Sequence, residues 1–382
     1  MLRKCLPRLY LGTMTFAWKQ ASSFVDDAAA LSFLTTFIAA GGTHVDTARI
    51  YAGGDTEPML GRAIAQLDRS TRSKLLVGSK AHPSEPGGLG QDGLHAQLGA
   101  SLEAVGTSST YTNVSIRLCM TVPEDSRFRS SARTLKSRHA ADTEHTLLES
   151  LRAADVMVRE NLVGAVGMSN YHSDEVARAY ALCEKHGLTK PSLYQGLYNP
   201  LNRNVEEALM PTLRANNCSF VAFNPLAAGL LAGVHRATGA DQAPAGRFRD
   251  NPNYLPRFYT EANFDALEQM QQACATHGWP LLDATYCWLL RHSALEGNDG
   301  MLLGASSVSQ LEANLGACER AAAADEGLPP PVRAAFDAAW AELPALRRGA
   351  FPYWRSYSAD MPEREGRDQG ASYQAHGPRS KK

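Results

Sequence analysis

The chain alternates short apolar runs with amphipathic stretches along most of its 382 residues. The runs that we predict to be strands are 9–13, 43–47, 75–79, 163–168, 192–196, 219–223 and 301–304. Windows between them, such as 26–42, 173–187 and 204–217, have apolar residues three and four apart and Gly or Asn near the C-terminal end. This alternation of apolar strands and helices predicts a parallel sheet covered by helices.

One strand is missing from this series, in the fourth position. A helix at 91–106 follows the third strand, and the next clear helix lies within 143–161, with a basic, serine-rich run at 114–142 between them. That run holds Pro123 and six cations, which we do not expect in a buried central strand. The cations are Arg117, Arg127, Arg129, Arg133, Lys136 and Arg138. We therefore predict a (β/α)8 TIM barrel over residues 1–356 whose fourth strand is disrupted by an atypical segment at 113–138.

Composition narrows the range of partners. A formal net charge of −1 gives no general field for nucleic acid or an anionic membrane, so a small ligand is the expected partner. The seven cysteines are scattered without a CxxC pair, which favours reduced thiols and a cytoplasmic location. No apolar stretch is long enough to span a bilayer, and the first residues turn polar too soon for a convincing signal peptide. The polar, turn-rich residues 357–382 are expected to be a disordered tail without function.

Polar side chains follow the strands at the end where a (β/α) barrel carries its active site. They are Asp46, Tyr51, Lys80, Ser169, Asn170 and Gln195. Asp46 and Lys80 each follow an apolar run, so we expect them to form an ion pair, and an ion pair with no further role is the alternative. A phenol titrates near pH ~10, and a neighbouring ammonium stabilises its phenolate. Tyr51 beside Lys80 is therefore a candidate general acid, and packing on the rim is the alternative.

The sequence lacks the motifs that are typical of two other classes of enzyme. No GxGxxG fingerprint follows a strand, which disfavours a Rossmann dehydrogenase. The histidines show neither HxH nor HExxH spacing, which speaks against a metal-dependent hydrolase, so no metal is predicted.

Several motifs, in order, resemble the aldo-keto reductase superfamily. GTHVDTARIYAGGDTEPMLGRAI and VGSKA resemble the blocks with the catalytic Asp, Tyr and Lys, and VGMSNY, YQGLYNPLNR and GASSVSQLEANLGA resemble later blocks. YNPL, NPLAAGLLAG, GRF and FPYWR are most similar to the aflatoxin-aldehyde reductase branch. The resemblance covers roughly 9–112 and 139–356. It implies NADPH-dependent reduction of aldehydes or ketones to alcohols, with a small carbonyl compound as substrate and no metal; formation of a homodimer is left open.

The resemblance also implies roles for four catalytic residues. Tyr51 would protonate the carbonyl oxygen, Lys80 would tune Tyr51, and Asp46 would hold Lys80. The fourth position is a His after the fourth strand, and HAAD at 139–142 resembles its usual setting, so His139 is the candidate that orients the carbonyl. A loop histidine without that role is the alternative.

The implied cofactor site has three parts. The carboxamide would bind Ser169, Asn170 and Gln195, and the nicotinamide would stack on Phe223. The pyrophosphate would contact the loop that holds Asn224, Leu226, Gly229 and Leu231, with Arg247 reaching a phosphate. The 2′-phosphate would lie at a helix N-terminus with Ser306, Ser307, Gln310 and Asn314, where no Arg or Lys precedes Arg320. A simple N-cap is the alternative for the two serines.

Substrate recognition is implied for Tyr254, Arg257 and Arg355. Two guanidinium groups would favour a carboxylate-bearing substrate such as a short semialdehyde, and surface ion pairs are the alternative.

The atypical segment leaves further alternatives. It is either translated non-coding sequence from an unremoved intron or a genuine surface insertion. The chain could accordingly be an inactive variant. A non-catalytic, cofactor-binding auxiliary subunit like those of potassium channels, which belong to the same superfamily, is the alternative from another functional class.

Overall fold

The strands close into one parallel barrel. The computed structural model describes residues 5–19, 21–106, 115–121, 145–233, 235, 248, 254–355, 357–368 and 370. Its strands are β1 (Arg8–Gly12), β2 (His44–Asp46), β3 (Leu76–Ala81), β4 (Ser115–Thr121), β5 (Ala165–Ser169), β6 (Leu193–Leu197), β7 (Ser219–Phe223) and β8 (Gly300–Leu303). Each pairs in parallel with the next, and β8 pairs with β1. The predicted (β/α)8 barrel is therefore confirmed.

The fourth strand lies at the start of the atypical segment. The backbone of β4 pairs with β3 on one side and β5 on the other, with Lys80 opposite Cys119 and Met120 opposite Met168. The expectation that 113–138 disrupts the fourth strand is thus wrong for 115–121. Only one of the six cations, Arg117, falls in this stretch, where apolar residues also alternate in the pattern typical of a strand. The remainder of the segment lies outside the described residues.

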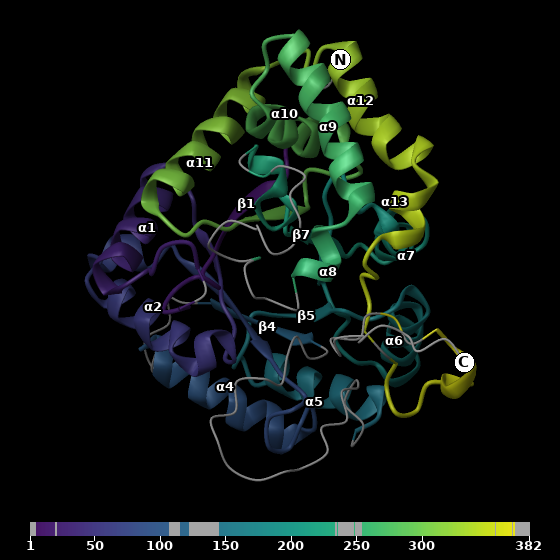
Figure 1. Cartoon of the computed structure of the whole chain (residues 1–382). Coiled ribbons are helices and arrows are strands. Elements are labelled where there is room, and N and C mark those ends of the chain that lie inside the picture. The colour runs from purple at the N-terminus through teal and green to yellow at the C-terminus, as the bar shows by residue number, and fades with distance from the viewer. Residues whose placement is uncertain are drawn as a thin grey trace.

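Helices surround the barrel, as Figure 1 shows. Those that follow the first five strands are α1 (Asp27–Ala39), α2 (Thr56–Ala65), α3 (Arg69–Arg72), α4 (Gln91–Val105), α5 (Leu147–Arg159) and α6 (Ser173–His186). The later ones are α7 (Leu209–Ala215), α8 (Leu255–Phe258), α9 (Glu261–Thr276), α10 (Leu281–Cys287), α11 (Val308–Ala323), α12 (Pro330–Glu342) and α13 (Pro344–Gly349). Shorter helical turns are η1 (Tyr51–Gly54), η2 (Asn204–Glu206), η3 (Ala227–Ala232), η5 (Trp288–His292) and η6 (Arg364–Gly366).

Local sequence explains where these helices begin and end. The Asp26 carboxylate accepts from the Ala29 amide at 2.8 Å and caps α1. Thr146 and Glu149 form a reciprocal capping box at the start of α5. Gly106 ends α4 in the left-handed conformation that glycine adopts readily. Buried apolar side chains such as Phe33 then hold the helices against the barrel.

The chain stays packed beyond residue 356. Tyr357, Ser358 and Met361 are buried, and the buried Glu175 carboxylate of α6 accepts from the Ser358 amide at 2.7 Å. Asp360 accepts from the Leu147 amide at 2.9 Å, at the first turn of α5. The expectation of a disordered tail from 357 on is therefore wrong for 357–368, because these polar side chains find partners on two barrel helices. Residues 371–382 lie outside the described residues.

Candidate active site

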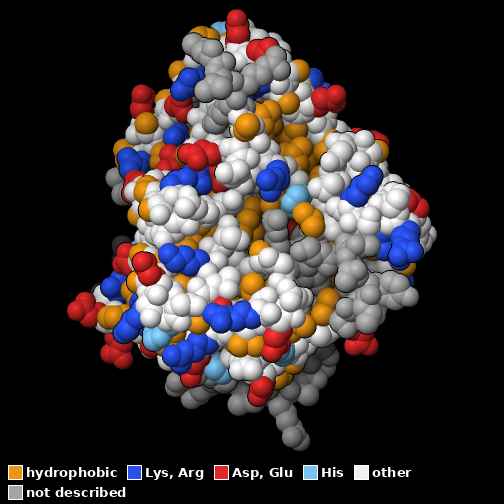
Figure 2. Space-filling view, turned by 180° about the vertical axis from the view of Figure 1, so that it is seen from behind, with side chains coloured by type: hydrophobic (Ala, Val, Ile, Leu, Met, Phe, Trp, Pro, Cys, Tyr) orange, Lys and Arg blue, Asp and Glu red, His pale blue; other side chains and the backbone are white. Residues whose placement is uncertain are grey.

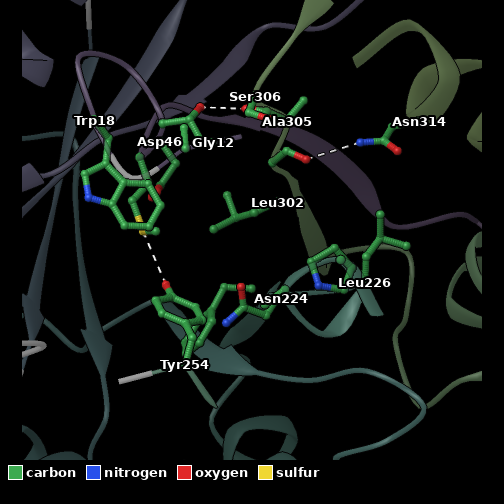
Figure 3. A pocket seen from close by; sticks show the side chains of 18 of the residues that line it. Gly12, Trp18, Asp46, Asn224, Leu226, Tyr254, Leu302, Ala305, Ser306 and Asn314 are labelled. Carbon is green, nitrogen blue, oxygen red and sulfur yellow. Dashed lines mark hydrogen bonds between the residues drawn. The ribbon is translucent and has the colours of Figure 1, made fainter. Parts of the chain in front are cut away.

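A large cavity opens at the carboxyl ends of the strands. Its volume is about 480 Å³, and its lining comes from the segments at the ends of β1, β2, β3, β5, β6, β7 and β8. Figure 3 shows Trp18, Asp46 and Tyr254 on one side of this cavity and Asn314 on the other. Because parallel strands all end on the same face of a barrel, side chains from distant parts of the sequence meet here.

Lys80 lies at the centre of a buried polar cluster at one end of the cavity. Its ammonium Nζ lies 2.7 Å from the Asp46 carboxylate, 2.8 Å from the Thr47 carbonyl oxygen and 3.1 Å from the Tyr51 hydroxyl. The Lys80 side chain is 7% exposed. The predicted ion pair between Asp46 and Lys80 is confirmed, and Tyr51 is the third member of the cluster.

The charge state of Lys80 follows from two opposing effects. Burial by itself lowers the pKa of Lys80, but the charges and hydrogen bonds of Asp46 and Tyr51 outweigh it and raise this pKa above its ordinary value. Lys80 is therefore an ammonium throughout the neutral range. It places a full positive charge beside the Tyr51 oxygen, where negative charge on a phenolate would develop.

Strand register and one strained turn bring the cluster together. Asp46 ends β2 opposite Gly78 of β3, and Lys80 lies two residues further along β3 on the same face. Tyr51 begins η1, in which Ala52 and Gly53 have φ angles of 49° and 71°. This left-handed turn costs free energy and directs the chain back toward α2.

The residues predicted for the carboxamide line the same cavity. Ser169 ends β5, Asn170 follows it, and Gln195 lies on β6 opposite Ser169. The Gln195 amide nitrogen donates to Asp46 at 2.8 Å, so its carbonyl oxygen is the end left for a ligand. Asn170 has a φ of 65°, and its backbone oxygen accepts from the Arg355 amide at 3.1 Å. The set offers both donors and acceptors, as a bound primary amide requires.

Most of the cofactor-binding residues predicted at the end of β7 and in the loop after it line the cavity. Phe223, Asn224, Leu226 and Gly229 line the cavity, whereas Leu231 is fully buried and does not. Leu231 was expected to bind cofactor, but its apolar side chain belongs to the core. A Cβ atom on Gly229, which has a φ of 114°, would lie 3.6 Å from the His235 ring.

The start of α11 lines the opposite end of the cavity. Ser306, Gln310 and Asn314 line it, and Ser306 donates from its amide and its hydroxyl to the Gln310 side chain, each at 2.9 Å. The Ser307 hydroxyl accepts from the Gln310 amide at 3.2 Å and does not line the cavity. Ser307 is thus the N-cap that was its alternative interpretation. Among the described lining residues, Lys80 is the only Lys or Arg.

Of the three residues predicted to recognise the substrate, only Tyr254 lines the cavity. Its hydroxyl lies 3.9 Å from the Met14 sulfur, and its ring centroid lies 6.4 Å from that of Trp18. The Arg257 guanidinium is 4.1 Å from the centre of the Phe351 ring, and Arg355 is also buried; neither lines the cavity. We expected the guanidinium groups of Arg257 and Arg355 to favour a substrate with a carboxylate. The described residues that line the cavity do not support this expectation.

Sequence reasoning missed several lining residues. His82 follows Lys80 by two positions, and strand alternation alone could have identified it. Met14, Trp18 and Ser22 also line the cavity and come from the segment after β1, which carries no motif. The Ser22 hydroxyl lies 2.5 Å from that of Ser306. Two predicted site residues, His139 and Arg247, lie outside the described residues.

The described residues offer neither a metal site nor a membrane span. Within the described ranges, no group of three or more His, Cys, Asp or Glu residues is arranged to hold a metal ion. None of the described helices is long and apolar enough to cross a bilayer. The face in Figure 2 shows Lys and Arg interspersed with Asp and Glu.

Comparison with known proteins agrees with this geometry. The model of the aldo/keto reductase family matches residues 8–326. Aflatoxin B1 aldehyde reductase member 2 of Mus musculus is 33% identical over 345 residues, which cover 87% of this chain and 84% of that protein. Aldo-keto reductase family 7 member A3 of Homo sapiens is 32% identical over 350 residues, covering 89% and 95%. Oxidoreductase sirO of Leptosphaeria maculans is 30% identical over 308 residues, covering 79% and 83%.

Proposed function

Because the chain belongs to the aldo/keto reductase family, we propose that it reduces aldehydes or ketones to alcohols with NADPH and with Tyr51 as general acid. The observation that carries this proposal is the position of the Lys80 ammonium, 2.7 Å from Asp46 and 3.1 Å from the Tyr51 hydroxyl at one end of a large cavity. A phenol beside a buried ammonium can release a proton more readily than a phenol in water.

The residues present suit a nicotinamide cofactor. Amide donors and acceptors lie beside the polar cluster, and Phe223 adds an aromatic ring to the same wall. We propose that Ser169, Asn170 and Gln195 hold the carboxamide, that Asn224, Leu226 and Gly229 contact the pyrophosphate, and that Ser306, Gln310 and Asn314 contact the adenosine end. When bound, NADPH supplies the hydride that adds to the carbonyl carbon.

The chain's own residues manage the proton. Tyr51 donates its hydroxyl proton to the carbonyl oxygen of the substrate, which becomes the alcohol, and is left as a phenolate. Lys80 stabilises that phenolate with its charge, and Asp46 keeps the ammonium in place. His139 remains the candidate that orients the carbonyl.

The proposed choice of NADPH over NADH rests on the resemblance of the motifs to the aldo-keto reductases and on Arg247. The cavity end formed by Ser306, Gln310 and Asn314 is uncharged among the described residues, and we propose that Arg247 supplies the cation for the 2′-phosphate. We expect NADP⁺ to bind more tightly than NAD⁺, and Arg247→Ala to reduce that difference by about tenfold. Equal affinity of the wild-type protein for both nucleotides would contradict the NADPH proposal.

We also propose a compartment and a partner. The described cysteines form no disulfide, which supports a reducing, cytoplasmic setting. The cavity suits a small carbonyl compound as the partner, and homodimer formation stays a prediction that sedimentation would test.

The deciding experiment follows NADPH consumption with two aldehydes, a short semialdehyde and an aromatic aldehyde without a carboxylate. We expect turnover of at least one, and a fall of about 1,000-fold or more in kcat for Tyr51→Phe with unchanged affinity for NADP⁺. Binding of NADP⁺ without turnover of either would instead favour the auxiliary-subunit alternative. A protein that neither binds nor turns over would support the inactive variant.

A further inference from the structure

Glu57 is a fully buried carboxylate that the proposed reaction does not use. It lies in the first turn of α2, has no exposed surface and does not line the cavity. Its Oε1 accepts from the Ser79 hydroxyl at 2.5 Å and its Oε2 from the Ser101 hydroxyl at 2.9 Å. The nearest described cation is Arg49, whose Nη1 lies 3.9 Å from Oε2. Burying a carboxylate on two hydroxyls and one distant cation is costly, and the contacts of this carboxylate show which elements it joins.

On one side Glu57 contacts the segment that carries Tyr51. That segment runs from Arg49 through η1 into α2, and its three residues after Tyr51 all have positive φ angles: 49°, 71° and 104°. The Arg49 guanidinium donates to the Gly54 carbonyl oxygen at 3.3 Å while it faces Glu57. Arg49 thus spans the strained turn from before Tyr51 to its end, with Glu57 as the anion behind it.

On the other side Glu57 contacts the strand that carries Lys80. Ser79 immediately precedes Lys80 on β3, and successive side chains of a strand point to opposite faces. Lys80 therefore points into the cavity while Ser79 points outward to Glu57. Ser101 of α4 provides the third attachment, so the carboxylate joins α2, β3 and α4 at one point.

We propose that Glu57 is a positioning residue that sets the Tyr51 segment against β3 and so maintains the contact between the Tyr51 hydroxyl and Lys80. The inference rests on the proposed function, since this contact has a catalytic consequence only if Tyr51 is the general acid. The contact spans 3.1 Å between side chains from two separate elements, and a shift of about 1 Å in such a pair is enough to reduce a rate strongly.

The chain offers a matched control for testing Glu57. Glu175 is also fully buried, also near the start of its helix, and also accepts from a serine, Ser358. Glu175→Gln therefore controls for the loss of a buried helix-start carboxylate, and urea unfolding measures how much stability each variant loses. Only Glu57→Gln is expected to lower kcat, by about tenfold, with the KM of the aldehyde and the affinity for NADP⁺ within about twofold of wild type.

A second readout needs no turnover. The ζ-carbon signal of Tyr51, in protein labelled with carbon-13 tyrosine and identified by its loss in Tyr51→Phe, reports ionisation of this phenol. In Glu57→Gln the signal is expected to titrate at higher pH than in wild type, because a more distant ammonium stabilises the phenolate less. In Glu175→Gln it should titrate as in wild type.

The outcomes separate this inference from the proposed function. An unchanged Tyr51 titration in folded Glu57→Gln, or the same change in Glu175→Gln, would overturn the role of Glu57. If Glu57→Gln does not fold, Ser79→Ala, which removes one of the two hydroxyl contacts, is expected to shift the same titration in the same direction. A wild-type protein that reduces no aldehyde would refute the proposed function, while the titration would still decide whether Glu57 positions Tyr51.

Discussion

The residues that line the cavity differ in how readily the sequence alone predicts them. Asp46, Tyr51 and Lys80 lie at or just after strand ends, where the fold class alone directs attention, and they meet within hydrogen-bond distance. Leu231 and Ser307 belong to the same motifs as residues that line the cavity. However, Leu231 packs in the hydrophobic core and Ser307 caps the N-terminus of α11. The sequence motifs thus located the candidate site, and the packing of the folded chain decided which residues of each motif line the cavity.

The Asp46–Lys80 pair leads to a prediction about stability and pH. Because the folded pKa of Lys80 is raised above its unfolded value, the stability it contributes is complete below pH about 10.4 and is lost as the pH rises through the folded value. Asp46→Asn leaves a buried ammonium without its carboxylate and should lower the free energy of unfolding by about 3 to 5 kcal/mol at pH 7.

Urea unfolding of both proteins between pH 7 and pH 11 checks this prediction. Above pH about 10 the unfolded chain loses the Lys80 proton, so the wild type gains less from holding it, while folded Asp46→Asn can release the proton and relieve its buried charge. The difference in free energy of unfolding between the two proteins should therefore shrink above pH about 10. A difference that stays constant or widens across this range would contradict it.

At the scale of elements, the structure depends on close approaches that sequence patterns do not reveal. Two helical glycines look alike in the sequence, Gly61 in α2 and Gly99 in α4. A Cβ atom on Gly61 would lie 2.3 Å from the backbone oxygen of Ala104, whereas a Cβ atom on Gly99 would have no neighbour within 4 Å. Gly61 therefore sets the distance between α2 and α4, the two helices that Glu57 also joins.

We expect opposite effects of alanine at these two positions. Gly61→Ala should push α2 away from α4 and lower the free energy of unfolding by about 2 kcal/mol or more, because the opposing atoms are backbone. Gly99→Ala should leave stability unchanged or raise it by up to about 1 kcal/mol, because alanine has the better helix propensity. Chemical denaturation of both variants tests this, and equal effects would refute it.

At the scale of the whole molecule, the barrel needs its fourth strand. β4 pairs with both neighbours, so its loss would leave β3 and β5 with unpaired edges. The translated intron and the genuine insertion both remain hypotheses about residues 113–138, and sequencing the transcript distinguishes them. β4 lies within this segment. A form of the protein that lacks residues 113–138 must therefore provide another strand to pair with β3 and β5.

Two deletions test that requirement. A chain that lacks residues 113–138 loses β4 and is expected to show no cooperative unfolding transition by circular dichroism. A chain that lacks only 122–138 keeps β4 and His139 and is expected to retain the transition. Cooperative unfolding of the first deletion at wild-type stability would show that the barrel closes without Ser115–Thr121.

The sequence by itself determined the barrel and the location of its chemistry, because the period of apolar residues specifies strands and helices and parallel strands all end on one face. The sequence-based prediction was wrong for Ser115–Thr121, because the basic composition of the surrounding segment hid a short strand. It was also wrong for 357–368, because polar residues there bind partners that are distant in the sequence. Tertiary structure alone decided that Arg257 packs on Phe351, that Trp18 reaches Tyr254, and that Glu57 connects two serines. These contacts join residues far apart in the chain, so no local pattern encodes them.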